Sequence, residues 1–510
     1  MENESIIFTK HDIDLFAAVS HDRNPLHCNY EYARKTPYGE PVVYGILGVL
    51  ACLGKLYKLN RKINITKLEA VFTAPFFCDI SYAISINRID DFRVEIIIFD
   101  GERKLLVLKV KFFEEREMGV TPPRARYISD MIIEKQAIDL DNDAIKEGQI
   151  YRYEYYPKID ALDLLLEKFN LQACPLEYLV TILAWSSYSI GMVLPGRKAL
   201  YSQIKLNIDK PLIYSASPIQ CIVRVDKFNR KYNLLSMEFE CFSVDGKKTS
   251  YGTFDAFIRQ EINILAFDLS DVLSKNRSIL AGKTALVTGA SRGLGAVIAK
   301  LLTAMSCRVI VNFQYSLEDA LLLQDEIIKN DGVIELWQGD ISNLNWLSQK
   351  KEELLARDEF LDILICNACQ PPQVLPLESY TVSRINAYIS KNIELTSVPL
   401  SLFAPIINDR HGYGIIISSE YVNDPQKEFP HYVSVKAAIE GLVQSTAPKY
   451  HDAKWMIVRP PRMLTDMSNS PVDNRGLADP VLIAKSICER LIADNEINRS
   501  HLVEIFVPEA

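Results

Sequence analysis

The chain contains 510 residues, of which 48% are hydrophobic and 24% are charged. At about 150 residues per domain, this length predicts roughly three folded domains, and a composition so rich in hydrophobic residues excludes a largely disordered chain. Because 57 Lys and Arg face 65 Asp and Glu, the formal charge is -8 and no general basic surface is available, so nucleic acid is not an expected partner.

The N-terminal segment has neither the basic start nor the apolar run of a signal peptide, and the ten cysteines are spread widely. We therefore expect a cytoplasmic protein. The most apolar windows, 42–53 and 178–194, are short or interrupted by polar residues. Because a membrane-spanning helix needs about 20 apolar residues, we expect both windows to form buried helices.

The first predicted elements are an apolar helix within 42–53 and a set of strands from 65 to about 114, in which apolar and polar residues alternate. The same order begins again at 175, with an apolar helix and later strands. This recurrence predicts one α+β fold used twice. The connector from 116 to 149 contains a Pro-Pro pair and an acidic stretch, which are typical of loops.

After residue 260, short apolar strands alternate with longer helical stretches, which is the α/β pattern of a doubly wound parallel sheet. The expected strands are 284–288, 308–312, 334–337, 361–365, 415–418, 455–458 and 503–507.

A glycine-rich turn, Thr288-Gly-Ala-Ser-Arg-Gly-Leu-Gly295, follows the first of these strands and opens a helix. Glycines at 289, 293 and 295 permit a tight turn and let backbone N–H groups approach a pyrophosphate at the positive end of the helix. A tight turn without a ligand is the simpler alternative, but the position between strand and helix favours nucleotide binding.

The identity of the nucleotide follows from the next strand. NAD sites usually carry an acidic residue about 20 residues further on, whereas this strand runs into Asn312-Phe-Gln-Tyr-Ser316 without one. A carboxylate there would repel a 2′-phosphate, and Arg292 offers it a charged donor. The sequence therefore favours NADP(H).

A catalytic set is suggested by Ser419, Tyr432 and Lys436. Tyr and Lys four residues apart share a helix face, and an ammonium beside a phenol is expected to lower the pKa of that phenol. Such a pair taken alone is often only a surface contact. Ser419, following a strand, is placed where open α/β sheets bind ligands.

Together these motifs make residues 280–510 resemble a short-chain dehydrogenase/reductase of the ketoacyl-thioester reductase type. The resemblance implies that Tyr432 is the acid, Lys436 binds ribose, Ser419 polarises the carbonyl and Asn392 anchors a proton-relay water. It further implies a cofactor-binding set of Gly289, Ser291, Arg292, Gly293, Leu294, Gly295, Asp340, Asn367, Tyr432, Lys436 and Thr465. The chain departs from the family at Cys369 and at Pro461, where glycines are usual. No metal site is expected, since the Cys366/Cys369 pair has no second pair to complete it.

Near the N-terminus, Asp22 and His27 flank Asn24-Pro25 on an expected loop, where they can share proton transfer at one carbon. From spacing alone, a hydrogen bond that stabilises the turn is the more common explanation. The string Asp22-Arg-Asn-Pro-Leu-His27, however, resembles the signature of the MaoC-like enoyl-thioester hydratases and dehydratases. That resemblance implies a hot-dog fold, an antiparallel sheet around a central helix, with Asp22 and His27 catalytic, Asn24 orienting the loop and the Gly45 amide holding the thioester oxygen. Here His21 replaces the usual glycine and Tyr44 the usual histidine.

The expected domains are a hot-dog domain (1–120), a connector (121–149), a second hot-dog domain without the motif (150–265), a linker (266–279) and a Rossmann domain (280–510). Combined, they predict reduction of a 3-oxoacyl thioester and dehydration to the enoyl product, with the substrate carried by a separate acyl carrier protein or CoA. We also expect a homodimer. The alternatives are a reductase with a non-catalytic hot-dog scaffold, the reverse reactions of β-oxidation, and an inactive NADP-binding regulator, which the complete Ser, Tyr, Lys and Asn set disfavours.

Overall fold

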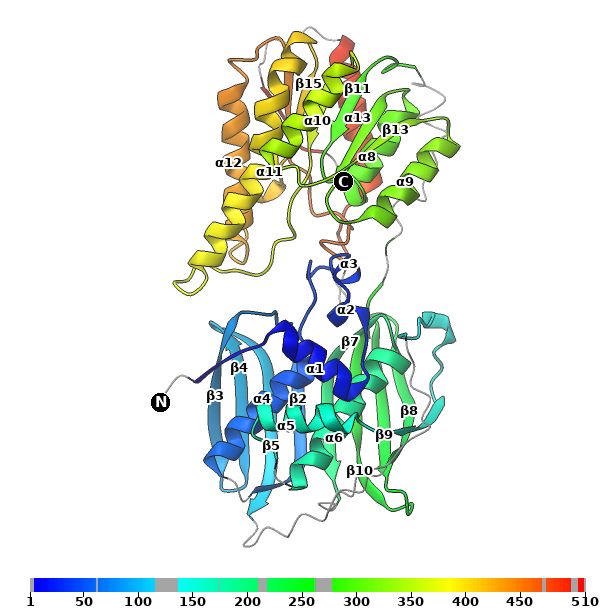
Figure 1. The fold of residues 1–510 in the computed structure, drawn as a ribbon, viewed down its shortest axis with the longest axis vertical. Helices are drawn as coiled ribbons and strands as arrows, with labels where there is room; N and C mark the ends of the chain where they lie inside the picture. The colour runs from blue at the N-terminus through cyan, green and yellow to red at the C-terminus, as the bar shows by residue number, and fades with distance from the viewer. Residues whose placement is uncertain are drawn as a thin grey trace. The chain divides into compact units, whose positions relative to one another are not determined.

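A computed structural model describes residues 4–60, 63–114, 136–172, 174–209, 218–260, 262, 278–469, 474–496 and 503–508. The chain forms two compact units. The N-terminal unit consists mainly of Met1–Arg34 and Glu40–Gln260, and the C-terminal unit mainly of Glu261–Asn469 and Asn474–Ala510. Figure 1 shows the first in blue to green and the second in green to red. Residues 266–277 of the expected linker and 121–135 of the expected connector lie outside the described residues.

The N-terminal unit is built on a ten-stranded antiparallel sheet in the order β1-β3-β4-β5-β2-β7-β10-β9-β8-β6. Its strands are β1 Glu4–Ile7, β2 Ile63–Phe72, β3 Ser81–Asp90, β4 Arg93–Asp100, β5 Arg103–Glu114, β6 Ile150–Tyr155, β7 Ala199–Ile208, β8 Ile219–Asn229, β9 Leu234–Phe242 and β10 Lys248–Ile258. Read inward from either edge, the order is the same in both halves. The repeat predicted from the sequence is therefore present in the topology, and pairing of β2 with β7 joins the halves into one sheet.

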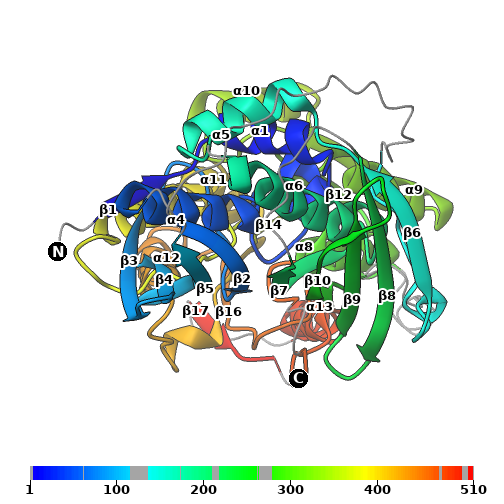
Figure 2. The same ribbon diagram turned by 90° about the horizontal axis from the view of Figure 1, so that it is seen from below.

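Each half carries one long helix at the corresponding place in the chain. Helix α4 (Gly45–Leu59) lies between β1 and β2, and α6 (Cys174–Tyr188), which continues into the π-helical turn η2 (Ser189–Val193), lies between β6 and β7. Figure 2 shows both on one face of the curved sheet. The remaining short helices are α1 Lys10–Ser20, α2 Pro25–Cys28, α3 Tyr30–Ala33, η1 Asn142–Ala144 and α5 Ile159–Lys168.

The second long helix contains the most membrane-like window among the described residues. Leu176–Val193 has a mean hydropathy of 1.2 over 18 residues, but 94% of it is buried inside the structure. Its side chains, among them Leu179, Leu183 and Trp185, belong to the core of the N-terminal unit. The expectation of a buried helix is confirmed for this window.

The C-terminal unit is a seven-stranded parallel sheet in the order β13-β12-β11-β14-β15-β16-β17. Its strands are β11 Thr284–Val287, β12 Arg308–Phe313, β13 Val333–Gln338, β14 Ile363–Cys366, β15 Tyr413–Ile417, β16 Lys454–Val458 and β17 Val503–Phe506. The doubly wound sheet predicted from the sequence is confirmed. The strand order reverses between β11 and β14, and in such sheets ligands bind at the carboxyl ends of the strands beside this reversal.

Helices cover both faces of this sheet. The apolar side chains of α8 (Gly293–Ala304), α9 (Leu317–Lys329) and α13 (Pro480–Glu496) pack in one core. Those of α10 (Leu344–Ala356), α11 (Val382–Asp409) and α12 (Pro430–Thr446) pack in the other. A short 3-10 helix, η3 (Glu420–Val422), follows β15. The central strands are thus buried on both sides, which explains their continuous apolar sequences.

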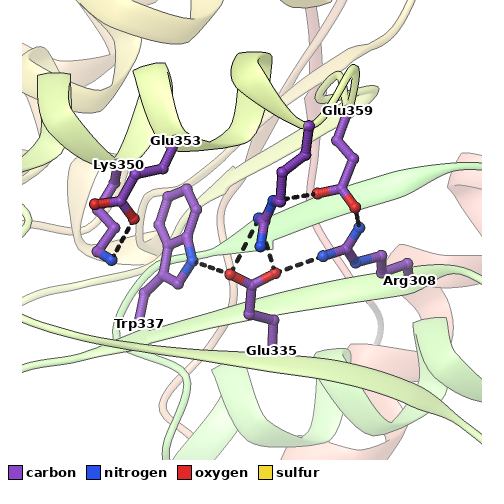
Figure 3. A network of polar contacts seen from close by, with 7 residues as sticks. Arg308, Glu335, Trp337, Lys350, Glu353 and Glu359 are labelled. Carbon is purple, nitrogen blue, oxygen red and sulfur yellow. Dashed lines mark hydrogen bonds and ion pairs between the residues drawn. The ribbon is translucent and has the colours of Figure 1, made fainter.

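A polar network supports the edge of the sheet at β12 and β13 (Figure 3). The Glu335 carboxylate accepts hydrogen bonds from Trp337 Nε1 at 2.8 Å, from Arg357 and from Arg308. Burial alone would raise the pKa of Glu335, but the hydrogen bonds from Trp337 and Arg357 bring it below its ordinary value. The ionised carboxylate is therefore the form that the folded unit prefers.

We predict that Glu335→Gln destabilises the C-terminal unit by about 1 kcal/mol at pH 7, because a networked, half-buried charge contributes more than an isolated surface pair. The ordinary Glu pKa is 4.5 and the folded one is lower, so the contribution is complete above pH 4.5 and disappears as pH falls through the folded pKa. Thermal unfolding at several pH values tests this. Glu353→Gln, which removes only the exposed pair with Lys350, is the control; equal losses in both variants would contradict the prediction.

Candidate active sites

The glycine-rich turn has the geometry that its sequence predicts. Gly289 (φ +61°) and Gly293 (φ +59°) adopt left-handed conformations, which favour glycine. At Gly295, a Cβ would lie 2.6 Å from Asn367 Nδ2 and 2.8 Å from the Gly289 oxygen, so a side chain does not fit. A Cβ on Gly293 would meet nothing within 4 Å. The turn thus leaves open space at the positive end of α8, where Arg292 is the N-cap and has no side-chain capping bond.

The residues expected beside this turn mainly brace it. The Asn367 amide donates to the carbonyls of Thr288 (3.1 Å) and Gly289 (3.0 Å), which ties the segment after β14 to the turn after β11. Ser291 and Leu294, in the turn itself, are buried. The two segments that follow β11 and β14, where the strand order reverses, are therefore held in place relative to each other.

Asp340 follows β13 and accepts hydrogen bonds from Lys391 Nζ at 2.8 Å and from Ser342. Burial would raise its pKa, but these bonds bring the pKa below its ordinary value. The carboxylate is therefore ionised at neutral pH and already fixed by groups of this chain.

Ser419, Tyr432 and Lys436 are brought together as expected. Ser419 follows β15 and caps η3, and its hydroxyl is hydrogen-bonded to the Tyr432 phenol. Lys436 lies one turn after Tyr432 on α12, with its Nζ 5.5 Å from the centre of the tyrosine ring. The Lys436 ammonium donates to the Ile417 carbonyl at 2.8 Å. All three side chains are thus held by β15 and α12.

The expected effect of Lys436 on the phenol is wrong for this geometry. Burial raises the pKa of Tyr432 above its ordinary value, the Cys369 thiol raises it further, and only the Ser419 hydrogen bond acts in the opposite direction. The Lys436 ammonium is engaged by a backbone carbonyl instead of the phenolic oxygen. Tyr432 is therefore a neutral phenol at pH 7, a proton donor and not a phenolate.

Asn392 is buried on α11 and fully engaged. Its Oδ1 accepts from the Gln370 amide at 2.8 Å, and its Nδ2 donates to Gln370 Oε1 and to the Tyr388 carbonyl. The Tyr388 hydroxyl in turn donates to the Gln370 carbonyl at 2.7 Å. Gln370 and Tyr388 were missed from the sequence, since neither belongs to a motif. Thr465, after β16, is hydrogen-bonded to Ser468.

In the N-terminal unit, the predicted loop from Asp22 to His27 needs correction. Helix α1 ends at Ser20, and His21 caps it in the left-handed conformation at φ 59°. Asn24 then caps α2, a single helical turn that begins at Pro25. His27 therefore lies on this turn and not on a loop. The glycine usual at position 21 would adopt this conformation freely. His21 adopts it with its Nε2 hydrogen-bonded to the Tyr156 carbonyl at 3.0 Å.

Asp22 is buried, with 1% of its surface exposed. Its carboxylate accepts hydrogen bonds from Ser187 Oγ at 2.7 Å and from the backbone N–H of Asn24 at 3.0 Å. Burial raises its pKa to about 7, although the Ser187 and Asn24 hydrogen bonds lower it. A Cβ on Gly191 would lie 2.5 Å from Asp22 Oδ1, so only glycine leaves room for the carboxylate. At neutral pH, protonated and ionised Asp22 are both populated.

Ser187 and Gly191 come from the second half of the unit, for which the sequence showed no motif. Asn24 makes the same connection, because its side chain donates to the carbonyls of Gly191 (2.9 Å) and Gly196 (3.0 Å). This side chain therefore ties the loop to the second half of the unit. The one sequence signal for Ser187 was the run of serines within an otherwise apolar helix.

His27 lies against Tyr44, with ring centres 3.9 Å apart. Its Nδ1 is 2.7 Å from the Val42 carbonyl, which can only accept, so Nδ1 carries the proton and Nε2 has a free lone pair. Burial lowers the pKa of His27 to about 4. The Tyr44 hydroxyl donates to the Asp22 carbonyl at 2.6 Å. Gly45 starts α4, and a Cβ there would lie 2.8 Å from the Phe72 ring. Asp22 and a neutral His27 are thus both fixed around Tyr44.

Each unit contains a segment that matches a known protein family. Residues 2–84 match the MaoC like domain, and residues 283–476 match the short chain dehydrogenase family. The chain therefore combines an N-terminal MaoC-like domain with a C-terminal short-chain dehydrogenase domain.

The curated proteins similar to this chain include two reductases. A fatty acyl-CoA reductase of Acinetobacter baylyi is 29% identical over 173 residues, 32% of this chain and 57% of that protein. A 3-oxoacyl-[acyl-carrier-protein] reductase of Rickettsia conorii is 29% identical over 169 residues, 32% of this chain and 66% of that protein. The chain thus spans less than two thirds of the length of either relative.

Among solved structures, a metagenomic short-chain oxidoreductase in complex with NADP is 26% identical, with a TM-score of 0.39; the match covers 46% of this chain and 100% of that one. An alcohol dehydrogenase from Thermococcus sibiricus complexed with 5-hydroxy-NADP is 20% identical, with a TM-score of 0.40; it covers 44% and 95% respectively.

We predict that Asp22→Asn stabilises the N-terminal unit at neutral and alkaline pH. The Asp22 pKa rises from 3.8 to about 7 on folding, so the wild type loses stability as pH increases across that window, by a few kcal/mol at about 1.4 kcal/mol per pKa unit. Asn keeps one acceptor, and its Nδ2 can donate to the Ser187 hydroxyl.

Chemical unfolding of the wild type and of Asp22→Asn at pH 5 and pH 8 measures this difference. Asp14→Asn, at an exposed carboxylate paired with Lys10, is the control and should show no such pH-dependent gain. A gain for Asp22→Asn that is equal at both pH values would refute the argument.

Proposed function

We propose that the protein is a bifunctional enzyme for the β-carbon of acyl thioesters, in which NADPH reduces a 3-oxoacyl thioester and the hydroxyl formed is then removed to give the trans-2-enoyl product. The main support for this proposal is that one chain contains two candidate sites, the Ser419/Tyr432/Lys436 set and the Asp22/His27 pair. The reactions proposed for both sites take place at C3 of the acyl group. The proposal assigns 1–120 and 150–265 to two hot-dog domains and 280–510 to the reductase domain.

The described residues fit NADP(H). The space over Gly293 and the N-terminus of α8 suit a pyrophosphate. Strand β12 ends at Phe313 and is followed by Gln314, Tyr315 and Ser316, so no carboxylate stands there to repel a 2′-phosphate. Arg292 supplies a cation beside the turn. Asp340, Asn367 and Thr465 would complete the site, with Asn367 acting through the turn that it braces.

In the reductive step, the bound dinucleotide would supply a hydride to C3 of the substrate. Ser419 Oγ holds the C3 carbonyl oxygen, and the neutral Tyr432 phenol donates its proton as that oxygen becomes an alkoxide. Lys436 would bind ribose, and Asn392, held by Gln370, would take part in a proton relay. The products of this step are the 3-hydroxyacyl thioester and a phenolate, which must be reprotonated from water.

In the dehydration step, the protonation states assign the roles. His27 Nε2 is free and unprotonated, so it takes the proton from C2. Protonated Asp22 donates to the C3 hydroxyl, which leaves as water while the C2–C3 double bond forms. Ser187 and the Asn24 amide hold the Asp22 carboxylate, and the Gly45 amide would stabilise the thioester oxygen.

A second candidate is a reductase whose N-terminal unit only binds acyl groups. It is favoured by His21 in a left-handed conformation and by Tyr44 in place of the family's histidine. The reverse pair of reactions, hydration and oxidation as in β-oxidation, would use the same residues. NADP(H) preference argues against that direction. The acyl group is proposed to arrive on a separate acyl carrier protein or CoA, and the active form is proposed to be a homodimer in the cytoplasm.

We predict that purified protein given NADPH and a short 3-oxoacyl thioester consumes cofactor and releases the enoyl thioester. Absorbance at the NADPH band and mass spectrometry of the acyl product follow the two steps. Asp22→Asn should leave NADPH oxidation within about twofold and accumulate the 3-hydroxyacyl species. Tyr432→Phe should reduce NADPH oxidation by at least about 100-fold, the usual contribution of a positioned proton donor.

The outcomes separate the alternatives. Accumulation of the 3-hydroxyacyl product by the wild type would favour the acyl-binding scaffold. Faster turnover with an enoyl thioester and NAD would favour the oxidative direction. Absence of cofactor oxidation with both carrier protein and CoA substrates would overturn the reductase assignment.

A further inference from the structure

An ion pair joins the two segments that flank the proposed cofactor site. Arg292, the N-cap of α8, approaches Asp466 with its NH1 atom 3.3 Å from Asp466 Oδ2. Asp466 directly follows Thr465, on the segment after β16. About a quarter of each side chain is exposed, 24% for Arg292 and 25% for Asp466. The pair is thus partly shielded from water and stronger than an ordinary surface contact.

The segment that carries Asp466 is held by its own hydrogen bonds. The Leu464 amide donates to the Ala478 carbonyl at 2.9 Å, and Ser468 closes a turn onto Thr465. Burial is the main cause that raises the pKa of Asp466, and the charge of Asp319 raises it further. The charge of Arg292 is the larger of two that lower it, the other being that of Lys35. The carboxylate therefore has a fixed place, and Arg292 is the cation that pairs with it directly.

We propose that Asp466 is a specificity-determining residue of the cofactor site, which competes with the 2′-phosphate of NADP(H) for Arg292. This inference rests on the proposed function, because it takes Arg292 as the cation available to that phosphate. A dinucleotide with a 2′-phosphate must draw the guanidinium away from Asp466, whereas one with a free 2′-hydroxyl leaves the ion pair intact. Asp466 thus reduces the preference for NADP(H) over NAD(H) that Arg292 alone would give.

The test is a double-mutant cycle on the full chain, read by direct binding. Dissociation constants for NADPH and NADH are measured by calorimetry for the wild type, Asp466→Asn, Arg292→Gln and the double variant. Asp466→Asn should bind NADPH roughly 3- to 10-fold more tightly and change NADH binding less than twofold. In the Arg292→Gln background, Asp466→Asn should no longer alter the ratio of the two constants. Glu353→Gln controls for the change in net charge.

Two results would overturn the proposal: an equal effect of Asp466→Asn on both cofactors, which would mean that Asp466 only supports the segment, or an effect on the ratio that persists without Arg292. Failure of the wild type to bind either cofactor would instead contradict the proposed function itself. Binding of both cofactors with an unchanged ratio contradicts only the role of Asp466.

Discussion

The pairing of β2 with β7 is the contact on which the N-terminal unit depends. Through it, two halves with the same strand order share one sheet, so the end of α6 is set against the loop that carries Asp22. Ser187 and Gly191 then enclose the carboxylate on the side where a lone first half would leave it to water. Desolvation follows from that enclosure, and desolvation is the main reason why the pKa of Asp22 rises to about 7. The half without a motif thereby contributes both to the burial of Asp22 and to its hydrogen bonding.

The C-terminal unit tunes its acid by the same physical means. Tyr432 lies on α12 and is partly buried, and the loss of water raises its pKa more than the Ser419 hydrogen bond lowers it. A phenol that stays protonated suits a donor that gives up its proton only when negative charge develops on a neighbouring oxygen. Burial thus raises the pKa of an acid in each unit. In the N-terminal unit it brings the pKa of the Asp22 carboxyl group close to neutral pH, and in the C-terminal unit it keeps the Tyr432 phenol protonated until negative charge develops on the substrate.

The sequence predicted those features that depend on residues close together in the chain. Alternation and turn chemistry located the strands of both sheets, because side-chain periodicity reports which face is buried. The glycine turn was predicted correctly since Gly289 and Gly293 need left-handed backbone. Contacts between distant segments were not predictable: Ser187 lies 165 positions from Asp22, and Gln370 lies 22 from Asn392. The prediction that the pKa of Tyr432 is lowered was wrong for the same reason. Burial of the phenol and the carbonyl that engages Lys436 are tertiary features, and a Tyr-x-x-x-Lys spacing does not reveal them.

The two departures from the MaoC-like motif are connected in the structure. Tyr44, in place of the family's histidine, stacks on His27 and donates its hydroxyl to the Asp22 carbonyl, so one side chain positions both members of the pair. His21, in place of glycine, bears a strained left-handed backbone, but its ring bonds to the Tyr156 carbonyl and meets the edge of Tyr155. A left-handed non-glycine residue costs roughly 1–2 kcal/mol, which such contacts can offset. Both replacements therefore preserve the position of Asp22, which argues for a retuned acid-base site over a vestigial one.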